Sequence, residues 1–126
     1  MVEAASPNRI SSSSELDEFL DRSQNGPVWL FKHSLICATS SRAYGEFLDF
    51  AAGLTDRDDA AVIEIQRARD ISMEAAERTR VRHQSPQVIL LRDGQAIWSA
   101  SHWDITEEAL ARAAQEYGEL AHADGA

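Results

Sequence analysis

The sequence predicts an α/β domain with helices on both faces of a small mixed β-sheet. Two short apolar runs, at 28–33 and 61–66, are separated by a segment of helical periodicity, and strands that are joined through a helix usually lie parallel. A further apolar stretch at 87–101 contains Asp93-Gly94, a dipeptide typical of the type I′ turn between antiparallel strands. The length of 126 residues fits one domain with its own core.

The chain begins with a segment that we expect to be a flexible tail, residues 1–12. A serine run follows, and Ser13 or Ser14 can accept hydrogen bonds from the free amides at the start of a helix. The sequence ELDEFLDR at 15–22 has acids in its first turn and apolar residues on one face, as in an amphipathic helix. The breaker Asn-Gly-Pro at 25–27 ends this helix.

The stretch VWLFKH at 28–33 is an almost continuous apolar run, which is typical of a central strand covered on both faces. The pattern changes at Cys37, after which apolar residues recur at helical spacing until Gly53, where a glycine can end the helix. The recurring residues are Tyr44, Phe47, Leu48 and Ala51. Cys37 is therefore predicted at the start of a helix that follows a buried strand.

The second half of the chain contains three further patterns. AVIEIQ at 61–66 is rich in β-branched residues and predicts a second strand. ISMEAAERTR at 71–80 predicts a helix, and QVILLRDGQAIWSAS at 87–101 predicts a hairpin. A final helix that covers the hairpin begins after Asp104 or Thr106, because either side chain can cap its N-terminus.

These elements give the order α-β-α-β-α-β-β-α. We expect the folded domain to span residues 13–120 and a short flexible tail to follow at 121–126. A parallel first pair of strands and a terminal hairpin, with helices on both faces, are the arrangement of a thioredoxin-like fold that carries an extra N-terminal helix.

Composition and charge narrow the class of protein. The chain is 44% hydrophobic and 26% charged, which is ordinary for a globular protein, and its formal net charge is −9. A negative chain without a run of lysine or arginine is a poor partner for nucleic acid or for an anionic membrane. A single cysteine cannot close an internal disulfide, and no signal-peptide pattern is present, so we expect a cytoplasmic protein.

The position of Cys37 suggests its chemistry. Unpaired amides and the dipole of a first helical turn favour a thiolate, and a sulfur stabilised in this way is a good leaving group when a second thiol attacks it. Such a site can accept a thiol adduct and pass it on with one cysteine. Ser40, one turn later, could donate its hydroxyl to the thiolate. We expect no metal site, because no paired spacing such as CxxC accompanies Cys37.

A second candidate feature is Ser85-Pro86, just before the third predicted strand. A bond that precedes proline can be cis at little cost, and we predict that Pro86 is cis. In a thioredoxin-like fold a cis proline lies beside the helix that carries the cysteine. It leaves the backbone of the preceding residue free to pair with an extended substrate, so we expect the Ser85 backbone to hold the adduct.

The sequence also resembles a known family. FKHSLICATS, VRHQSPQVILLRDG and WSASHWDIT resemble, in order and spacing, the monothiol bacilliredoxins, the thioredoxin-like proteins of the bacillithiol system. The similarity covers roughly residues 14–112. The family commonly has Thr-Cys-Pro where this chain has Ile36-Cys37-Ala38. Thus the hydroxyl before the sulfur and the rigid first turn are both missing here.

The resemblance implies a cytosolic monothiol-disulfide oxidoreductase in which Cys37 removes bacillithiol from S-bacillithiolated proteins, or accepts it. Bacillithiol is then a co-substrate, and no bound cofactor is implied. The reductant that regenerates Cys37 is either bacillithiol itself or a thioredoxin-type dithiol. Because bacillithiol carries malic-acid carboxylates, basic groups near Cys37 would anchor it. The candidates are Lys32, His33, Arg82 and His83.

Several alternatives remain open at this level. The chain could be a non-catalytic thioredoxin-like adaptor that binds a peptide beside Pro86, with an incidental thiol. It could also carry an iron–sulfur cluster like monothiol glutaredoxins, although the Gly-Phe-Ser sequel of those carriers is missing after Cys37. His33 could equally end a strand and bind a loop carbonyl. His102 and Trp103 could border the cleft, or Trp103 could simply fill the core.

Overall fold

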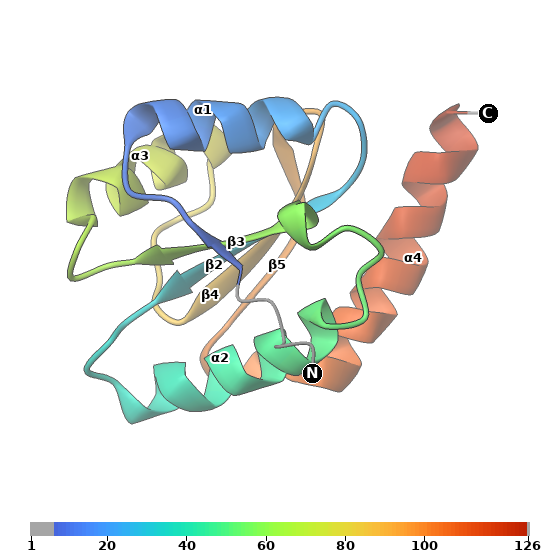
Figure 1. The fold of residues 1–126 in the computed structure, drawn as a ribbon. Helices are drawn as coiled ribbons and strands as arrows, with labels where there is room; N and C mark the ends of the chain where they lie inside the picture. Colours follow the sequence, from blue (N-terminus) through green and yellow to red (C-terminus); the bar gives the residue numbers. More distant parts are fainter. Residues whose placement is uncertain (1–6, 126) are drawn as a thin grey trace, which may run out of the picture.

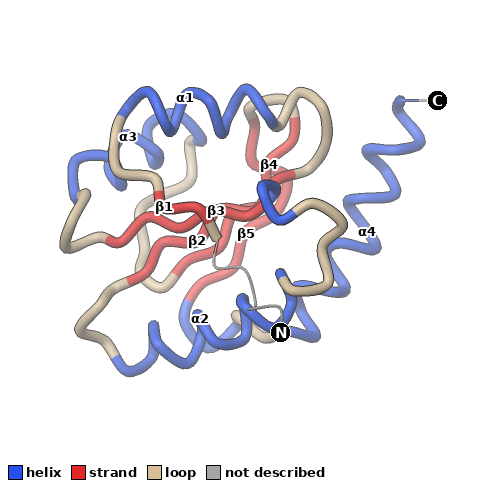
Figure 2. Tube along the Cα trace, viewed as in Figure 1, coloured by secondary structure: helices blue, strands red, loops and turns tan. Residues whose placement is uncertain are grey.

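A mixed β-sheet of five strands, in the order β1-β3-β2-β4-β5, forms the centre of the domain (Figure 2). The computed structural model describes residues 7–125, with side chains for 7–117. Strands β1 and β2 run parallel to β3, whereas β4 runs antiparallel to both β2 and β5. The predicted parallel pair and terminal hairpin are therefore confirmed. The strands are β1 (Asn8–Arg9), β2 (Val28–His33), β3 (Ala60–Glu64), β4 (Gln87–Arg92) and β5 (Gln95–Ser101).

Helices cover both faces of this sheet, as predicted (Figure 1). Helices α1 and α3 lie on one face, and α2 and α4 lie on the other. Short 3₁₀ turns, η1 and η2, precede β3 and α4. The bounds are α1 (Ser13–Arg22), α2 (Ala38–Ala51), η1 (Arg57–Asp59), α3 (Arg69–Thr79), η2 (His102–Asp104) and α4 (Glu107–Gly125). Within residues 7–125, no helix is long and apolar enough to cross a membrane.

Strand β2 divides the core into two layers because successive side chains of a strand point to opposite faces. Val28 and Leu30 pack with residues of α1 and α3 in one layer. Trp29 and Phe31 pack with residues of α2 and α4 in the other. Continuing this alternation places Lys32 on the α1/α3 face, where it is fully buried.

Part of the predicted N-terminal tail belongs to the sheet, so the prediction is wrong there. Asn8–Arg9 form strand β1 at the edge of the sheet, and the buried Ile10 donates its N–H to the Val62 carbonyl at 2.9 Å. The apolar side chain of Ile10 joins the α1/α3 core layer, which holds this segment against β3. The helix cap is Ser12, whose side chain accepts from the Glu15 N–H, in place of the predicted Ser13 or Ser14. Residues 1–6 of the predicted tail lie outside the described residues.

The hairpin and the C-terminal helix also show how the sequence sets local structure. Asp93 and Gly94 both have positive φ angles, 56° and 74°, as a type I′ turn requires. Thr106 is the cap of α4, because its Oγ1 accepts from the Ala109 N–H at 3.0 Å. The helix continues to Gly125, so the predicted boundary between domain and tail at residue 120 does not coincide with a helix end.

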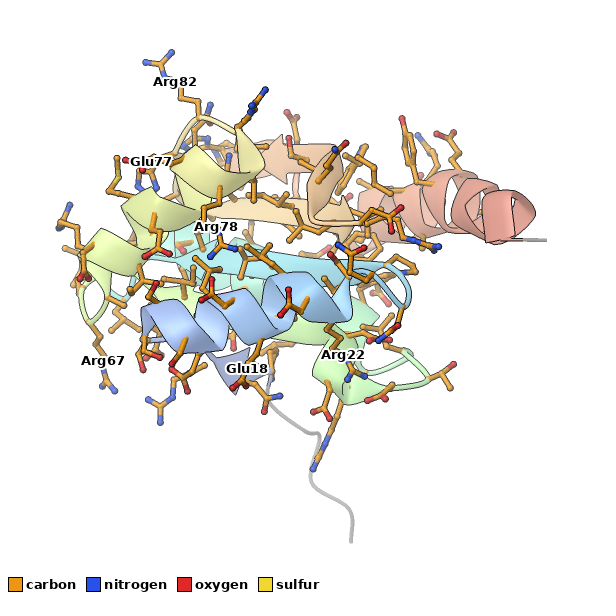
Figure 3. The ribbon with its side chains drawn as sticks, turned by 90° about the horizontal axis from the view of Figure 1, so that it is seen from above. Glu18, Arg22, Arg67, Glu77, Arg78 and Arg82 are labelled. Carbon is orange, nitrogen blue, oxygen red and sulfur yellow. The ribbon has the colours of Figure 1, made fainter. Side chains whose placement is uncertain are left out.

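Ion pairs link α1 to its neighbours, and their arginines, Arg22 and Arg78, are labelled in Figure 3. Arg22, at the end of α1, pairs with Asp56 and Asp59 beside η1. Arg78 of α3 pairs with Asp17 of α1 and with Glu74 in its own helix. These arginines are balanced by carboxylates, unlike the buried lysine of β2.

Candidate active site

Cys37 is the N-cap residue of α2, as the sequence predicted. Its backbone is extended, with φ −116° and ψ 122°, while its carbonyl already accepts from the Ser41 N–H at 3.0 Å. The thiol makes no capping hydrogen bond to the helix, and the residue is partly exposed. Cys37 therefore stands at a helix start, where the amides of the first turn favour negative charge.

The loop that leads to Cys37 is held by Gln66, a residue that sequence reasoning placed inside a strand. Gln66 lies just after β3, and its Oε1 accepts from the Leu35 N–H at 2.8 Å. Its Nε2 donates to Ser34 Oγ at 3.0 Å. Ile36, next to the thiol, is 85% exposed. One side chain thus fixes two successive loop residues and leaves the apolar Ile36 facing solvent at the site.

Ser40 supports this loop through hydrogen bonds inside the protein. We predicted that its hydroxyl would donate to the Cys37 thiolate, but its hydrogen-bond partners are other groups. The side chain is fully buried, and its Oγ accepts from the Ser34 N–H at 2.9 Å. The same Oγ lies 2.7 Å from Nδ1 of His33. The hydroxyl is thus within hydrogen-bond distance of both the imidazole and the loop amide, and the tautomer of His33 decides which side chain donates in the first of these contacts. The structure therefore gives Ser40 a supporting role in place of a contact with the thiolate.

His33, the last residue of β2, is buried beneath the site, with 8% of its surface exposed. Its ring stacks on Tyr44 of α2 with a centroid distance of 4.6 Å. Burial lowers the pKa of His33, while the neighbouring Glu64 acts in the opposite direction. A neutral ring can accept the Ser40 proton at Nδ1. His33 thus resembles the strand-end alternative more than the predicted adduct anchor, because little of it can meet a ligand.

Lys32 lies on the opposite face of the sheet and is also unavailable for direct contact with an adduct. It is fully buried, although the sequence predicted it as a ligand anchor. Its Nζ donates to the Ser72 carbonyl of α3 at 2.9 Å and lies 3.2 Å from Nδ1 of His83. Burial lowers the pKa of Lys32 to about 8. His83, the residue that Lys32 contacts, remains partly exposed.

The Ser85–Pro86 bond is cis, as predicted. The antiparallel register pairs Lys32 with Gln87, so the next positions, His33 and Pro86, lie side by side at the end of β2. Cys37 follows shortly after this strand end. Pro86 is buried, and the Oγ of the partly buried Ser85 has no partner among the described residues. The thiol and the cis proline are therefore both built on the same end of β2.

A further part of the site follows β5. The His102 N–H donates to the Pro86 carbonyl at 3.1 Å, which fixes η2 beside the proline. Arg42 of α2 donates to the His102 carbonyl at 2.9 Å and lies 4.7 Å from the ring centroid of Trp103. Trp103 is 68% exposed, so it does not fill the core. Sequence reasoning did not identify Arg42, which has no motif around it.

Arg82 is the remaining basic residue that the sequence predicted near the site. Arg82 is exposed and points outward from the segment after α3 (Figure 3). Its backbone carbonyl accepts from Nε2 of Gln87 at 2.9 Å, so the chain from Arg82 to Pro86 forms a closed loop. Among the residues that the structure describes, no three His, Cys, Asp or Glu side chains are grouped so that they could hold a metal ion.

A partly exposed cysteine at a helix start and a cis proline at the same end of β2, in a sheet of this order, define a thioredoxin-like protein. The sequence model of the monothiol bacilliredoxin BrxC family matches residues 8–110. The chain belongs to this family, and its fold and family together support a thiol redox function.

Solved structures agree with this assignment. A protein proposed to be an oxidoreductase with a thioredoxin fold is 31% identical, with a TM-score of 0.75 over 85% of this chain and 92% of that one. A poplar thioredoxin h mutant has a TM-score of 0.72 and 16% identity over 93% of this chain and 88% of that one. A thioredoxin from Malassezia sympodialis has a TM-score of 0.70 and 14% identity, covering 94% and 96%. At such low identity the two thioredoxins show the fold alone.

Proposed function

We propose that the chain is a cytoplasmic monothiol-disulfide oxidoreductase whose Cys37 exchanges bacillithiol with protein mixed disulfides. The observation that carries this proposal is the placement of the partly exposed Cys37 at the N-terminus of α2, on the same strand end as Pro86. The family match and the thioredoxin-like fold support a thiol redox function. Bacillithiol as the thiol, and the cytoplasm as the compartment, are part of the proposal.

The exchange needs one cysteine and balances without an external oxidant. The Cys37 thiolate attacks the bacillithiol sulfur of a protein mixed disulfide, a Cys37–bacillithiol disulfide forms, and the protein leaves as a thiolate that takes a proton from water. A second thiol, from bacillithiol or a thioredoxin-type dithiol, then attacks the adduct. Cys37 leaves as a thiolate, and the attacking thiol becomes part of a new disulfide. Bacillithiol is thus a co-substrate and not a bound cofactor.

The surroundings of Cys37 suit this cycle. The first-turn amides stabilise the thiolate that leaves in the second step. Gln66 and Ser40 hold the loop before Cys37 at its Ser34 and Leu35 amides. The exposed Ile36, the residue before Cys37, provides apolar surface beside the thiol. A protein with a mixed disulfide can therefore approach a sulfur whose position is already fixed.

The proposal is tested by the adduct that Cys37 forms. The purified protein is incubated with bacillithiol disulfide, glutathione disulfide or coenzyme A disulfide, and mass spectrometry follows labelling and release, with Cys37→Ser as the unreactive control. We expect bacillithiol to label Cys37 faster than the other two thiols and to be released by an added thiol. Equal rates for all three would remove the bacillithiol assignment. An adaptor with an incidental thiol predicts slow labelling by every disulfide.

A further inference from the structure

Arg42 of α2 is a cation that is held without a carboxylate. Its Nη2 donates to the His102 carbonyl at 2.9 Å, and its guanidinium carbon lies 4.7 Å from the ring centroid of Trp103. Its Nε is buried and has no hydrogen-bond partner among the described residues. The ion pairs found among residues 7–117 do not include it. In a chain of net charge −9, an arginine that binds a backbone carbonyl in place of an acid calls for an explanation.

His102, the residue that Arg42 contacts, has a strained backbone. Its φ is 55°, in the left-handed region that residues with a side chain rarely adopt. Such a conformation persists only where the surrounding contacts determine it. The His102 N–H donates to the Pro86 carbonyl at 3.1 Å, and the His102 carbonyl accepts from Arg42 and, at 3.3 Å, from the Ile105 N–H. Arg42 is thus one of the groups that hold His102 in this conformation.

The contact between His102 and Pro86 limits the backbone that a substrate can use. Proline has no N–H, and the Pro86 carbonyl is already paired with His102. An extended peptide that pairs with the chain beside the proline therefore has to use the backbone of Ser85. Because the proline ring restricts rotation between the two residues, fixing the Pro86 carbonyl also fixes the orientation of Ser85.

The thiol and the cis proline belong to different elements, and Arg42 connects them. Cys37 is the N-cap of α2, the helix that contains Arg42, whereas Pro86 directly precedes β4. Strand β2 joins the two elements on one side, since α2 follows its end and β4 pairs with it. The contacts from Arg42 to His102 and from His102 to Pro86 make a second connection, from the body of α2 through η2.

We propose that Arg42 is a positioning residue for thiol exchange. By holding the His102 carbonyl, it fixes the Ser85–Pro86 segment relative to the helix that carries the thiol. Trp103 keeps the guanidinium in place through a cation–π contact. The role concerns protein substrates, because a small disulfide needs the thiol but not a backbone to pair with. The inference rests on the proposed function and adds the residue that sets how a protein-bound disulfide is presented to Cys37.

The connection is measured first without any substrate. Arg42→Met keeps an apolar side chain that can contact Trp103 and removes the donor to His102. We expect the His102 amide, which donates to Pro86, to exchange with solvent several-fold faster in this variant, as followed by NMR. Arg42→Lys keeps a charged donor and should retain most of the protection. Circular dichroism checks that both variants fold. Unchanged protection of the His102 amide in Arg42→Met would overturn the connection.

Glu46 provides a matched control, because it makes another hydrogen bond from α2 to the segment after β5. Its Oε1 accepts from the Glu107 N–H at 2.8 Å, at the start of α4. Glu46→Ala removes this contact and leaves the His102 carbonyl paired with Arg42. We expect the His102 amide in this variant to exchange as in the original chain. Equal acceleration by Glu46→Ala and Arg42→Met would show a general loosening of α2 and would overturn a specific role for Arg42.

The exchange reaction tests the consequence for substrates. The reduced chain is mixed with a single-cysteine peptide that carries bacillithiol as a mixed disulfide, or with bacillithiol disulfide. Mass spectrometry follows the formation of the Cys37 adduct in a single turnover. In Arg42→Met the half-saturating peptide concentration should rise about tenfold, while the limiting rate and the reaction with bacillithiol disulfide are unchanged. Arg42→Lys should restore most of the affinity, and Glu46→Ala should leave both reactions unchanged.

Failure of the positioning role differs from failure of the proposed function. If Arg42→Met slows the reactions with the peptide and with bacillithiol disulfide equally, or changes neither, Arg42 does not position the docking segment. If Cys37 of the original chain reacts with neither disulfide, the proposed function fails. The exchange of the His102 amide then still decides whether Arg42 fixes the segment at Pro86.

Discussion

Nδ1 of His33 lies 2.7 Å from Oγ of Ser40, and this contact joins the end of β2 to the first turn of α2 across the loop that leads to the thiol. The same Oγ accepts from the Ser34 N–H at 2.9 Å. Both side chains are buried. The position of Cys37 therefore depends on buried hydrogen bonds, in which the Ser40 hydroxyl contacts both the Ser34 amide and the His33 imidazole.

Replacing Ser40 by alanine should destabilise the protein by about 1–3 kcal/mol, because the partly buried Ser34 N–H and the buried His33 Nδ1 both lose a partner. Urea denaturation measures the free energy of unfolding. Ser41→Ala is the matched control: Ser41 is exposed, and its replacement should change this free energy by less than about 0.5 kcal/mol. Equal effects of the two substitutions would contradict the supporting role of Ser40.

His33 should make the protein sensitive to acid. Burial lowers its pKa in the folded state below the ordinary value of 6.5, so the unfolded chain binds a proton at a higher pH than the folded one. Stability is then fully present above the unfolded pKa and falls as the pH drops below it. His33→Asn removes the titration and can keep an acceptor near the Nδ1 position. We expect urea denaturation to show a smaller loss of stability in this variant between neutral and mildly acidic pH.

The remaining histidines do not obscure that comparison. His83 also has a lowered pKa and adds acid sensitivity of the same sign, but it is present in both chains and cancels in the difference. If the free energy of unfolding depends on pH in the same way in the original chain and in His33→Asn, the burial of His33 does not contribute to the acid sensitivity.

Lys32 should make the free energy of unfolding depend on pH in the alkaline range. Its pKa is lowered from 10.5 to about 8 by burial, so between these values the unfolded chain binds more protons than the folded chain. Stability therefore rises with pH through this window, by up to about 3 kcal/mol. Lys32→Met lacks this gain. We expect the difference in free energy of unfolding between the two chains to change in favour of the lysine form as the pH rises from about 7 to about 10.

The groups around Lys32 have to be considered in the same experiment. His83 and Arg69 are the other basic groups of this cluster, and both are retained in Lys32→Met. Arg82→Met is the control for loss of a cation, since Arg82 is exposed. It should show no change of stability specific to the alkaline range. A pH-independent difference between Lys32→Met and the original chain would show that the ammonium is not strained by burial.

Much of the fold could be predicted because its signals are local. The apolar run behind Pro27 predicted β2 with the bounds that the structure has, Val28–His33. Asp93-Gly94 predicted a turn that needs two positive φ angles. Strand β1 could not be predicted in this way. Asn8–Arg9 have no strand-forming pattern, and they pair because the free edge of β3 and the burial of Ile10 hold them there.

In the candidate site, too, local sequence signals predict some features and miss others. The place of Cys37 follows from a strand followed by a helix, both visible in the sequence. The role of Lys32 depends on long-range contacts with Ser72 and His83, and that of His33 on a contact with Ser40 in the next helix. The alternation of side chains in β2 does predict one feature of the site. Neighbouring residues in a strand that is covered on both faces must point to opposite layers. Lys32 and His33 could therefore not both have lined one ligand pocket.

The loop before Cys37 should loosen when Gln66 is replaced. Gln66→Ala removes the acceptor of the Leu35 N–H and the donor to Ser34 Oγ. The contacts are exposed, so the free energy of unfolding should change by less than about 1 kcal/mol, while the Leu35 amide should exchange with solvent several-fold faster. Hydrogen exchange followed by NMR measures this amide directly.

Gln66→Glu keeps the oxygen acceptor and should retain the protection of Leu35. The exposed Gln115→Ala serves as a control that leaves it unchanged. Slow exchange of Leu35 in Gln66→Ala would mean that Ser40 alone holds the loop.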